Sequence, residues 1–91
     1  MIILGIETSC DETSLSIINE DNHLMSNVIV SQHSTHSQHG GIIPELASRQ
    51  HIINIEDAFE NCIKNASVKL DDISVIGVTN GPGLIGSLIV V

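Results

Sequence analysis

Carboxylate and hydroxyl side chains are crowded into one short segment near the start of the chain. Residues 7–13 hold three carboxylates and three hydroxyls in seven positions. Hydroxyls and turn N–H groups can cradle a phosphate, while carboxylates beside them can hold a hydrated cation, position water or accept a proton. A solvated polar turn is the alternative, and the residues alone leave both open. Cys10 is a weak candidate nucleophile because its segment has no basic residue to lower the thiol pKa.

A glycine-rich stretch near the other end is the second candidate. Residues 81–86 read GPGLIG, which literally fits the GxGxxG pattern of dinucleotide-binding turns. That pattern requires the first strand of a βαβ unit, whereas the hairpins that precede this stretch read as antiparallel. One interpretation is a tight strand-to-helix turn whose glycines permit close packing. The other is an anion or nucleotide site at a helix N-terminus.

Three histidines spaced three residues apart form a third candidate. His33, His36 and His39 lie in QHSTHSQHGG, just before a double glycine. Three imidazoles and a water would make an open catalytic metal site. The surrounding Ser, Thr and Gln residues instead favour a polar loop with incidental histidines, and the spacing alone does not decide between them.

Hydrophobic patterning predicts the elements that position these segments. Three strands joined by short turns form an antiparallel meander, and an amphipathic helix follows, with Pro44 and Glu45 suited to its first turn. A strand that is apolar on both parities comes next, as expected for a strand covered on both faces. The predicted order is βββαβα: strands 2–7, 13–19 and 23–31, a helix over about 44–66, a strand over 74–79 and a helix from Gly83.

The predicted helix has one regular apolar stripe. Its members recur at steps of three and four, which indicates a single buried face. Ile53 and Ala58 lie off this stripe and predict a surplus of apolar surface. The stripe consists of Ile52, Ile55, Phe59, Cys62 and Ala66.

Composition narrows the class of protein. Eleven acidic and three basic residues among 91 give a net charge of −8, which opposes phosphate backbones, so we do not expect this chain alone to hold nucleic acid. Neither a signal peptide nor a membrane span is predicted, and two distant cysteines suggest reduced thiols, so a cytoplasmic location is expected. The apolar run over 83–91 stops without capping residues, which suggests the amino-terminal part of a larger protein.

Three motifs in order resemble the TsaD family, the catalytic subunit that makes threonylcarbamoyladenosine in tRNA. They are LGIETSCDET over residues 4–13, then Ser31-Gln32, His36 and GGIIPELASR over 40–49 with His51, and finally GPGLIG over 81–86. In the family pattern only His36 of the three histidines is a motif position, and His39 replaces the usual aromatic residue. The resemblance therefore implies that the histidine loop is not a metal site.

The resemblance implies a fold and a set of cofactors. The family is similar to actin, Hsp70 and sugar-kinase ATPases, with two ribonuclease-H-like lobes. Residues 1–91 would be the amino-terminal part of the first lobe, with the second lobe absent. One divalent iron or zinc ion and ATP or an adenylate belong to the full-length protein. The metal ligands, an HxxxH pair and an aspartate, are expected further along, so this chain alone would hold neither cofactor.

The implied activity is that of a tRNA N6-adenosine threonylcarbamoyltransferase. Adenine N6 attacks the carbonyl of threonylcarbamoyl-AMP, and AMP leaves. Thr8 and Ser9 are expected to contact phosphate or threonylcarbamoyl oxygens. The resemblance also points to the glycines of the 81–86 turn, Gly81 and Gly83, as substrate-binding positions. Asp11 and Glu12 are expected to order the site as catalytic acids.

The implied partners are tRNA, a scaffold paralogue bound through the first-lobe helices and an accessory ATPase subunit. No membrane is expected, and the chain alone is expected to form a homodimer. Glu45 and Arg49 can be either functional or a structural pair at the helix start. Alternative functions are a non-catalytic actin-like scaffold or binding module, and a generic actin-like ATPase or sugar kinase. A metalloprotease is not favoured, because there is no HExxH.

Overall fold

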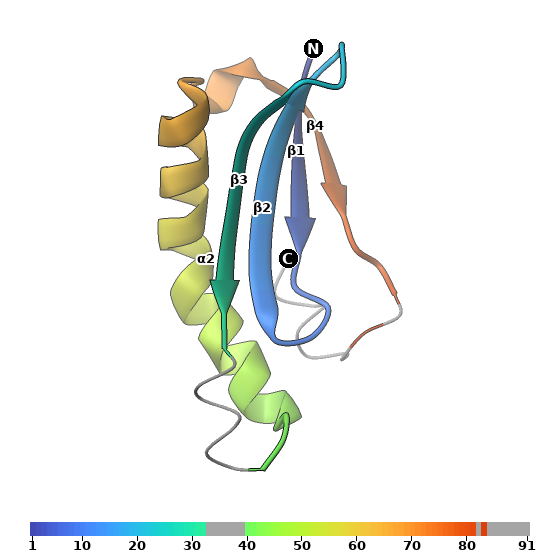
Figure 1. Cartoon of the computed structure of the whole chain (residues 1–91), viewed down its shortest axis with the longest axis vertical. Coiled ribbons are helices and arrows are strands. Elements are labelled where there is room, and N and C mark those ends of the chain that lie inside the picture. Colours follow the sequence, from blue (N-terminus) through green and yellow to red (C-terminus); the bar gives the residue numbers. More distant parts are fainter. Residues whose placement is uncertain (33–39, 82, 84–91) are drawn as a thin grey trace.

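Four strands and one long helix make up the described part of the molecule (Figure 1). The structure is a computed structural model that describes residues 1–32, 40–81 and 83. The βββαβ order is confirmed, while the helix predicted after Gly83 lies outside the described residues. The bounds are β1 Ile2–Glu7, β2 Glu12–Asn19, β3 Leu24–Ser31, α2 Pro44–Ala66, a 3₁₀ turn η1 Leu70–Asp72 and β4 Ile73–Val78.

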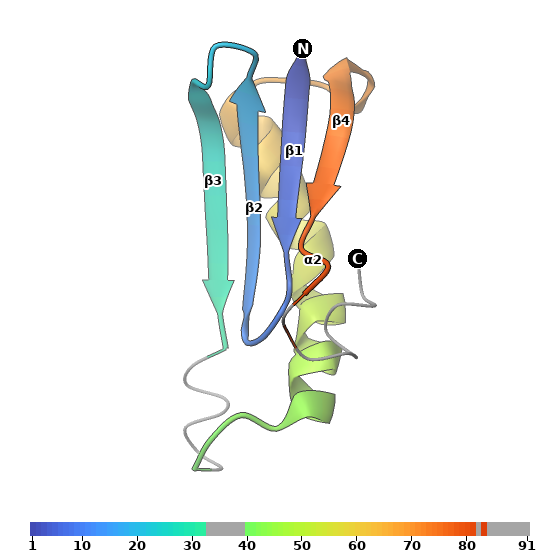
Figure 2. The same cartoon turned by 90° about the vertical axis from the view of Figure 1, so that its right-hand side faces the viewer.

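The strands form one mixed sheet in the order β3-β2-β1-β4 (Figure 2). β1 and β2 are antiparallel, as are β2 and β3, so the predicted meander is confirmed. β4 lies parallel to β1, which the long connection through α2 permits. The carboxyl ends of β1 and β4 therefore point to the same end of the sheet.

β2 shows why the strands form where they do. The side chains of Thr13, Leu15 and Ile17 are 0% exposed, whereas the serines between them are half-buried. Because successive side chains of a strand point to opposite faces, this alternation directs one row toward α2 and the other row, Ser14 and Ser16, away from it. α2 packs against β2 and β3 on that single face.

α2 begins and ends at identifiable signals. Ile43 is extended and Pro44 follows within the first helical turn, where its missing N–H costs nothing. At the other end Ser67 takes a left-handed conformation with φ of 58°, and its N–H bonds to carbonyls of the last turn. The predicted bounds of about 44–66 are confirmed.

The buried face of α2 differs from the predicted stripe. Ile52 is 63% exposed, and Ala58, which was predicted to lie off the face, is 1% exposed. The physical reason is size: small side chains let the helix axis approach the sheet closely, so the contact is centred on them. The core-facing residues of α2 are Ala47, His51, Ala58, Cys62 and Ala66.

β4 was predicted to be covered on both faces, and among the described residues this is wrong. Val75 is 45% exposed on one side of the strand, and Ile76 is 59% exposed on the other. α2 lies over β2 and β3, so it does not reach this edge of the sheet. Within the described part of the chain, no helix combines the length and hydropathy needed to cross a lipid bilayer.

Candidate functional site

The ends of β1 and β4 bring two of the three candidate segments together. Beyond the strands the pairing continues, because the Thr79 N–H donates to the Ile6 carbonyl at 3.2 Å. Gly83 then lies directly on Ser9: a Cβ built on Gly83 would be 2.6 Å from both the carbonyl oxygen and the Cβ of Ser9. Gly83 of the glycine-rich stretch therefore lies against the carboxylate turn, although the two are distant in sequence.

Within the first turn, Glu7 already binds one of the N–H groups that an anion could use. Its Oε1 accepts the Ser9 N–H at 2.6 Å. Thr8 is 1% exposed, so its side chain lies inside the protein rather than at the surface of the site. Ser9 is half-buried. The roles of Thr8 and Ser9 as substrate contacts stay predictions.

Asp11 and Glu12 occupy the remainder of the turn. Asp11 is half-buried and Glu12 is exposed at the first position of β2. The backbone at Asp11 is held by β3, since its carbonyl accepts the Gln32 N–H at 3.0 Å. Both carboxylates thus stand on a fixed backbone at the end of the sheet where Gly83 also lies. That placement suits a catalytic role for the two acids, which remains a prediction.

Cys10 is poorly placed to act as a nucleophile. Desolvation by burial raises the pKa of its thiol above the ordinary value, and the Asp11 carboxylate raises it further by repulsion and by accepting a hydrogen bond from the thiol. The Glu7 carboxylate acts in the same direction. The thiolate is the reactive form, so the raised pKa lowers the reactive fraction of Cys10 near neutral pH.

His51 is the residue at this site whose role the sequence did not reveal. It is 0% exposed on α2, and its ring contacts the turn at two points. Nδ1 lies 2.7 Å from the Thr13 hydroxyl, and Nε2 lies 2.8 Å from the Cys10 carbonyl oxygen. The sole sequence signal was its place in the family motif, because helix periodicity predicts an apolar residue at such a position.

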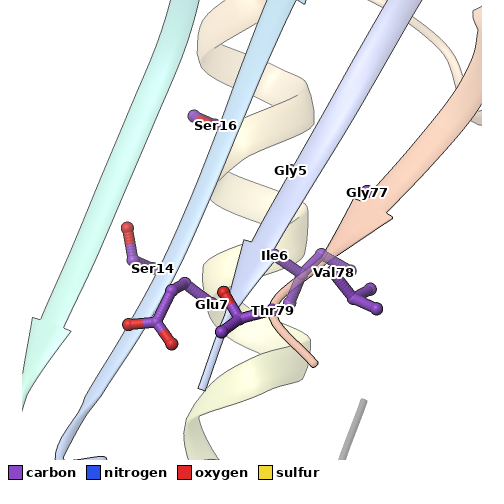
Figure 3. A pocket seen from close by; sticks show the side chains of 8 residues that line it. All are labelled: Gly5, Ile6, Glu7, Ser14, Ser16, Gly77, Val78 and Thr79. Atoms are coloured by element: carbon purple, nitrogen blue, oxygen red, sulfur yellow. The ribbon is translucent and has the colours of Figure 1, made fainter. Parts of the chain in front are cut away.

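An open groove of about 380 Å³ runs over the sheet face opposite α2 (Figure 3). Its floor is a pair of glycines on neighbouring strands, Gly5 and Gly77, which are in register. Glu7 and Thr79 lie together at the end nearer the two turns. The groove therefore opens onto the candidate site. Its lining residues are Gly5, Ile6, Glu7, Ser14, Ser16, Gly77, Val78 and Thr79.

The histidine loop was the candidate for a metal site. His33, His36 and His39 lie outside the described residues, so their loop stays untested. Among residues 1–32, 40–81 and 83 there is no cluster of three or more His, Cys, Asp or Glu side chains that could hold a metal ion.

Arg49 Nη2 donates a hydrogen bond to Glu45 Oε1 at 2.6 Å, one helical turn away, and both side chains are exposed. This is the geometry of a structural pair on a helix surface.

Comparison with known proteins identifies the family of the chain. Residues 23–91 match the family described as TsaD, tRNA N6-adenosine threonylcarbamoyltransferase. The chain belongs to the TsaD family. A TsaD relative from Rickettsia massiliae is 51% identical over 97% of this chain, and one from Rickettsia bellii is 48% identical over the same share. The chain spans 26% of the length of each of these TsaD relatives.

A solved structure agrees with the fold expected for a TsaD first lobe. YeaZ from Pseudomonas aeruginosa matches with a TM-score of 0.66 and covers 98% of this chain and 34% of its own. At 17% identity the likeness concerns the fold alone. The predicted fold class, an α/β ribonuclease-H-like lobe with a mixed sheet as in actin-like ATPases, is confirmed for the described elements.

Proposed function

We propose that this chain is part of a tRNA N6-adenosine threonylcarbamoyltransferase. The observation that carries the proposal is the 51% identity along 97% of the chain to a relative of that name. The substrate class follows from the proposed reaction: threonylcarbamoyl-AMP as donor, and the N6 amine of the adenosine beside the anticodon of a tRNA as acceptor. The C–O bond to AMP breaks as the N6–C bond forms, and the N6 proton is lost.

The two joined turns are proposed to bind the donor. Ser9 and the N–H groups of the glycine turn at Gly81 and Gly83 would hold phosphate or carbamoyl oxygens, with the Thr8 hydroxyl supporting the turn from inside. The contact between Gly83 and Ser9 supports this assignment because it makes one binding surface of both segments. A ligand anion would compete with Glu7 for the Ser9 N–H.

Asp11 and Glu12 are proposed to act at the acceptor end. A carboxylate within reach of the N6 amine can accept its proton as the bond to the carbonyl forms. Glu12 is exposed and Asp11 half-buried, so either can face a substrate that lies against the turn. The individual roles are separable by substitution.

The proposed cofactors are one divalent iron or zinc ion and ATP or the adenylate. The described residues do not fit a metal, since they hold no cluster of three suitable ligands. From the family resemblance, we propose that the metal ligands belong to parts of the full-length protein outside this chain.

The proposed partners follow from charge and from exposed apolar side chains. A net charge of −8 opposes tRNA, so other parts of the protein or its complex would supply the positive surface. Ile52 and Ile53 on α2 are more than half exposed and suit a helix-to-helix contact with a scaffold paralogue, or with a second copy when the chain is alone. An accessory ATPase subunit and a cytoplasmic location complete the proposal.

The test is transfer by the full-length protein assembled with its partner subunits. Incubation with threonylcarbamoyl-AMP and unmodified tRNA should yield threonylcarbamoyladenosine, measured by mass spectrometry of the digested nucleosides. The 91-residue chain alone should yield none. Absence of product from the full assembly would overturn the proposal. ATP hydrolysis or sugar phosphorylation without nucleoside modification would identify a generic actin-like ATPase or kinase instead.

A further inference from the structure

His51 joins α2 to the carboxylate turn through both of its ring nitrogens. The Cys10 carbonyl oxygen can only accept, so the Nε2 that lies 2.8 Å away carries the hydrogen. In the neutral ring Nδ1 is then the acceptor, and the Thr13 hydroxyl donates to it across 2.7 Å. With both nitrogens engaged and the side chain 0% exposed, His51 is not available as a metal ligand or as a base toward substrate.

The two hydrogen bonds of His51 hold the turn on either side of Asp11 and Glu12. Cys10 and Thr13 flank Asp11 and Glu12 directly, so the bonded carbonyl and hydroxyl bracket both carboxylates. The Thr13 side is also held by the pairing of β2 with β3, so the bond to the Cys10 carbonyl adds a hold on the other side of the acids. His51 therefore fixes the backbone from which both acids project.

A second link fastens the same turn to the same helix. The Gln32 N–H donates to the Asp11 carbonyl at 3.0 Å, and its side-chain amide donates to the Ala47 carbonyl at 3.2 Å. Ala47 lies one helical turn before His51, and both face the sheet. Gln32 is 1% exposed. The turn is thus tied to two successive turns of α2 through buried groups.

Stability alone does not explain a histidine at this position. The other fully buried residues of α2 are alanines and a cysteine, and the helix packs closely through them. A buried polar side chain is favourable only when all of its hydrogen-bonding groups are satisfied, and here they are satisfied by the turn rather than by the helix or the hydrophobic core. The hydrogen bonds of His51 therefore fix the geometry of the acidic turn.

We propose that His51 is a positioning residue for the transferase reaction, holding Asp11 and Glu12 in their working geometry without touching substrate. This inference rests on the proposed function. It predicts that loss of the two bonds lowers the rate of the chemical step while substrate affinity is largely kept, because these bonds go to Cys10 and Thr13 and not to Ser9 or Gly83.

The experiment uses four variants of the full-length protein in its complex. His51→Phe removes both bonds and keeps an aromatic ring. Thr13→Val removes only the hydroxyl, with little change of shape. His51→Gln keeps an amide N–H able to reach the Cys10 carbonyl. His23→Gln, an exposed histidine at the far end of the β2–β3 hairpin, is the matched control.

We expect His51→Phe to lower kcat about tenfold and to change KM for the adenylate less than about twofold. The kcat of Thr13→Val should lie between that of His51→Phe and that of the unmodified protein. The kcat of His51→Gln should be within about threefold of the unmodified value. Combining His51→Phe with Thr13→Val should cost no more than His51→Phe alone, because both remove the same bond. His23→Gln should leave kcat unchanged.

A second readout does not depend on activity. Alkylation of Cys10 in the folded protein reports how firmly the turn is held, and it should be about threefold or more faster in His51→Phe than in the unmodified protein. A lower melting temperature with unchanged kcat and unchanged alkylation would reduce His51 to a structural residue and overturn the inference. If His51→Phe does not fold, Thr13→Val and His51→Gln decide by the same criteria. Faster alkylation in a protein without transferase activity would reject the proposed function and retain the tether.

Discussion

Gly83 and Ser9 lie in direct contact at the carboxyl ends of β4 and β1. A Cβ on Gly83 would be 2.6 Å from the Ser9 carbonyl oxygen and 3.0 Å from its Cα. Real Cβ atoms do not approach backbone so closely, so a side chain at position 83 would force one of the two turns to move. Close approach, rather than a special backbone angle, is the requirement for glycine here.

Substituting Gly83 should separate the two halves of the proposed donor site. Gly83→Ala in the full-length protein is expected to lower kcat/KM for the adenylate about tenfold or more, because the glycine turn must shift away from Ser9. Steady-state transfer assays measure this. Ser74→Ala, an exposed change at the other end of β4, serves as the control. Equal activity of Gly83→Ala and the control would show that the contact has no functional role.

The acids of the turn are expected to matter for rate and not for folding. Asp11→Asn and Glu12→Gln should each cut modification at least about tenfold, roughly 1.4 kcal/mol of barrier. Circular dichroism should stay unchanged because neither side chain is fully buried. Asp21→Asn, exposed in the β2–β3 turn, is the matched control. Near-normal rates from both acid variants would reduce these residues to a solvated turn.

The chemistry of Cys10 reports the field of the neighbouring acids. Because burial and, after it, the Asp11 carboxylate raise the pKa of the thiol, the thiolate fraction at about pH 8 is below that of an ordinary cysteine. Asp11→Asn should lower that pKa and speed alkylation by iodoacetamide severalfold. The rate in the unmodified protein should still be climbing above about pH 9. Cys62, at 0% exposed, is an internal control that should not react while the chain is folded. A slower reaction in Asp11→Asn would refute this account.

Association of the chain should depend on the outer face of α2. Ile53 is 64% exposed, so Ile53→Glu is expected to convert a dimer of the isolated chain into a folded monomer. Ala58→Glu, on the buried face at 1% exposed, should instead unfold the chain. Sedimentation and circular dichroism separate these outcomes. An unmodified chain that stays monomeric at high concentration would contradict the prediction.

Ser26 offers a test of the core. Its hydroxyl oxygen is buried and has no hydrogen-bond partner among the described residues. Ser26→Ala removes this unsatisfied group and should raise the free energy of unfolding by about 1 kcal/mol. Urea denaturation followed by circular dichroism measures the difference. A loss of stability on this substitution would mean that the hydroxyl is bonded in solution.

Local patterns in the sequence were sufficient to predict the described strands and the helix, and their order along the chain. The alternation of Leu15 and Ile17 with serines identified β2, because side chains of a strand alternate between faces wherever that strand is placed. Pro44 marked the start of α2 through its own backbone geometry. The run of apolar residues over 74–79 was sufficient to predict β4 as a strand. Each of these signals acts within a few residues.

Only the tertiary structure decided which surfaces meet. Periodicity placed Ile52 in the core and Ala58 outside it. The rotation of a helix about its axis depends on how closely it can approach the sheet, and the face with the small residues allows the closer approach. The exposure of Ile76 depends on how far α2 extends across the sheet, which no local pattern encodes. The bonds of His51 to the turn, and the contact of Gly83 with Ser9, join residues far apart in the chain. Such pairs are fixed by strand order and helix placement together, so they exist only once the sheet has formed.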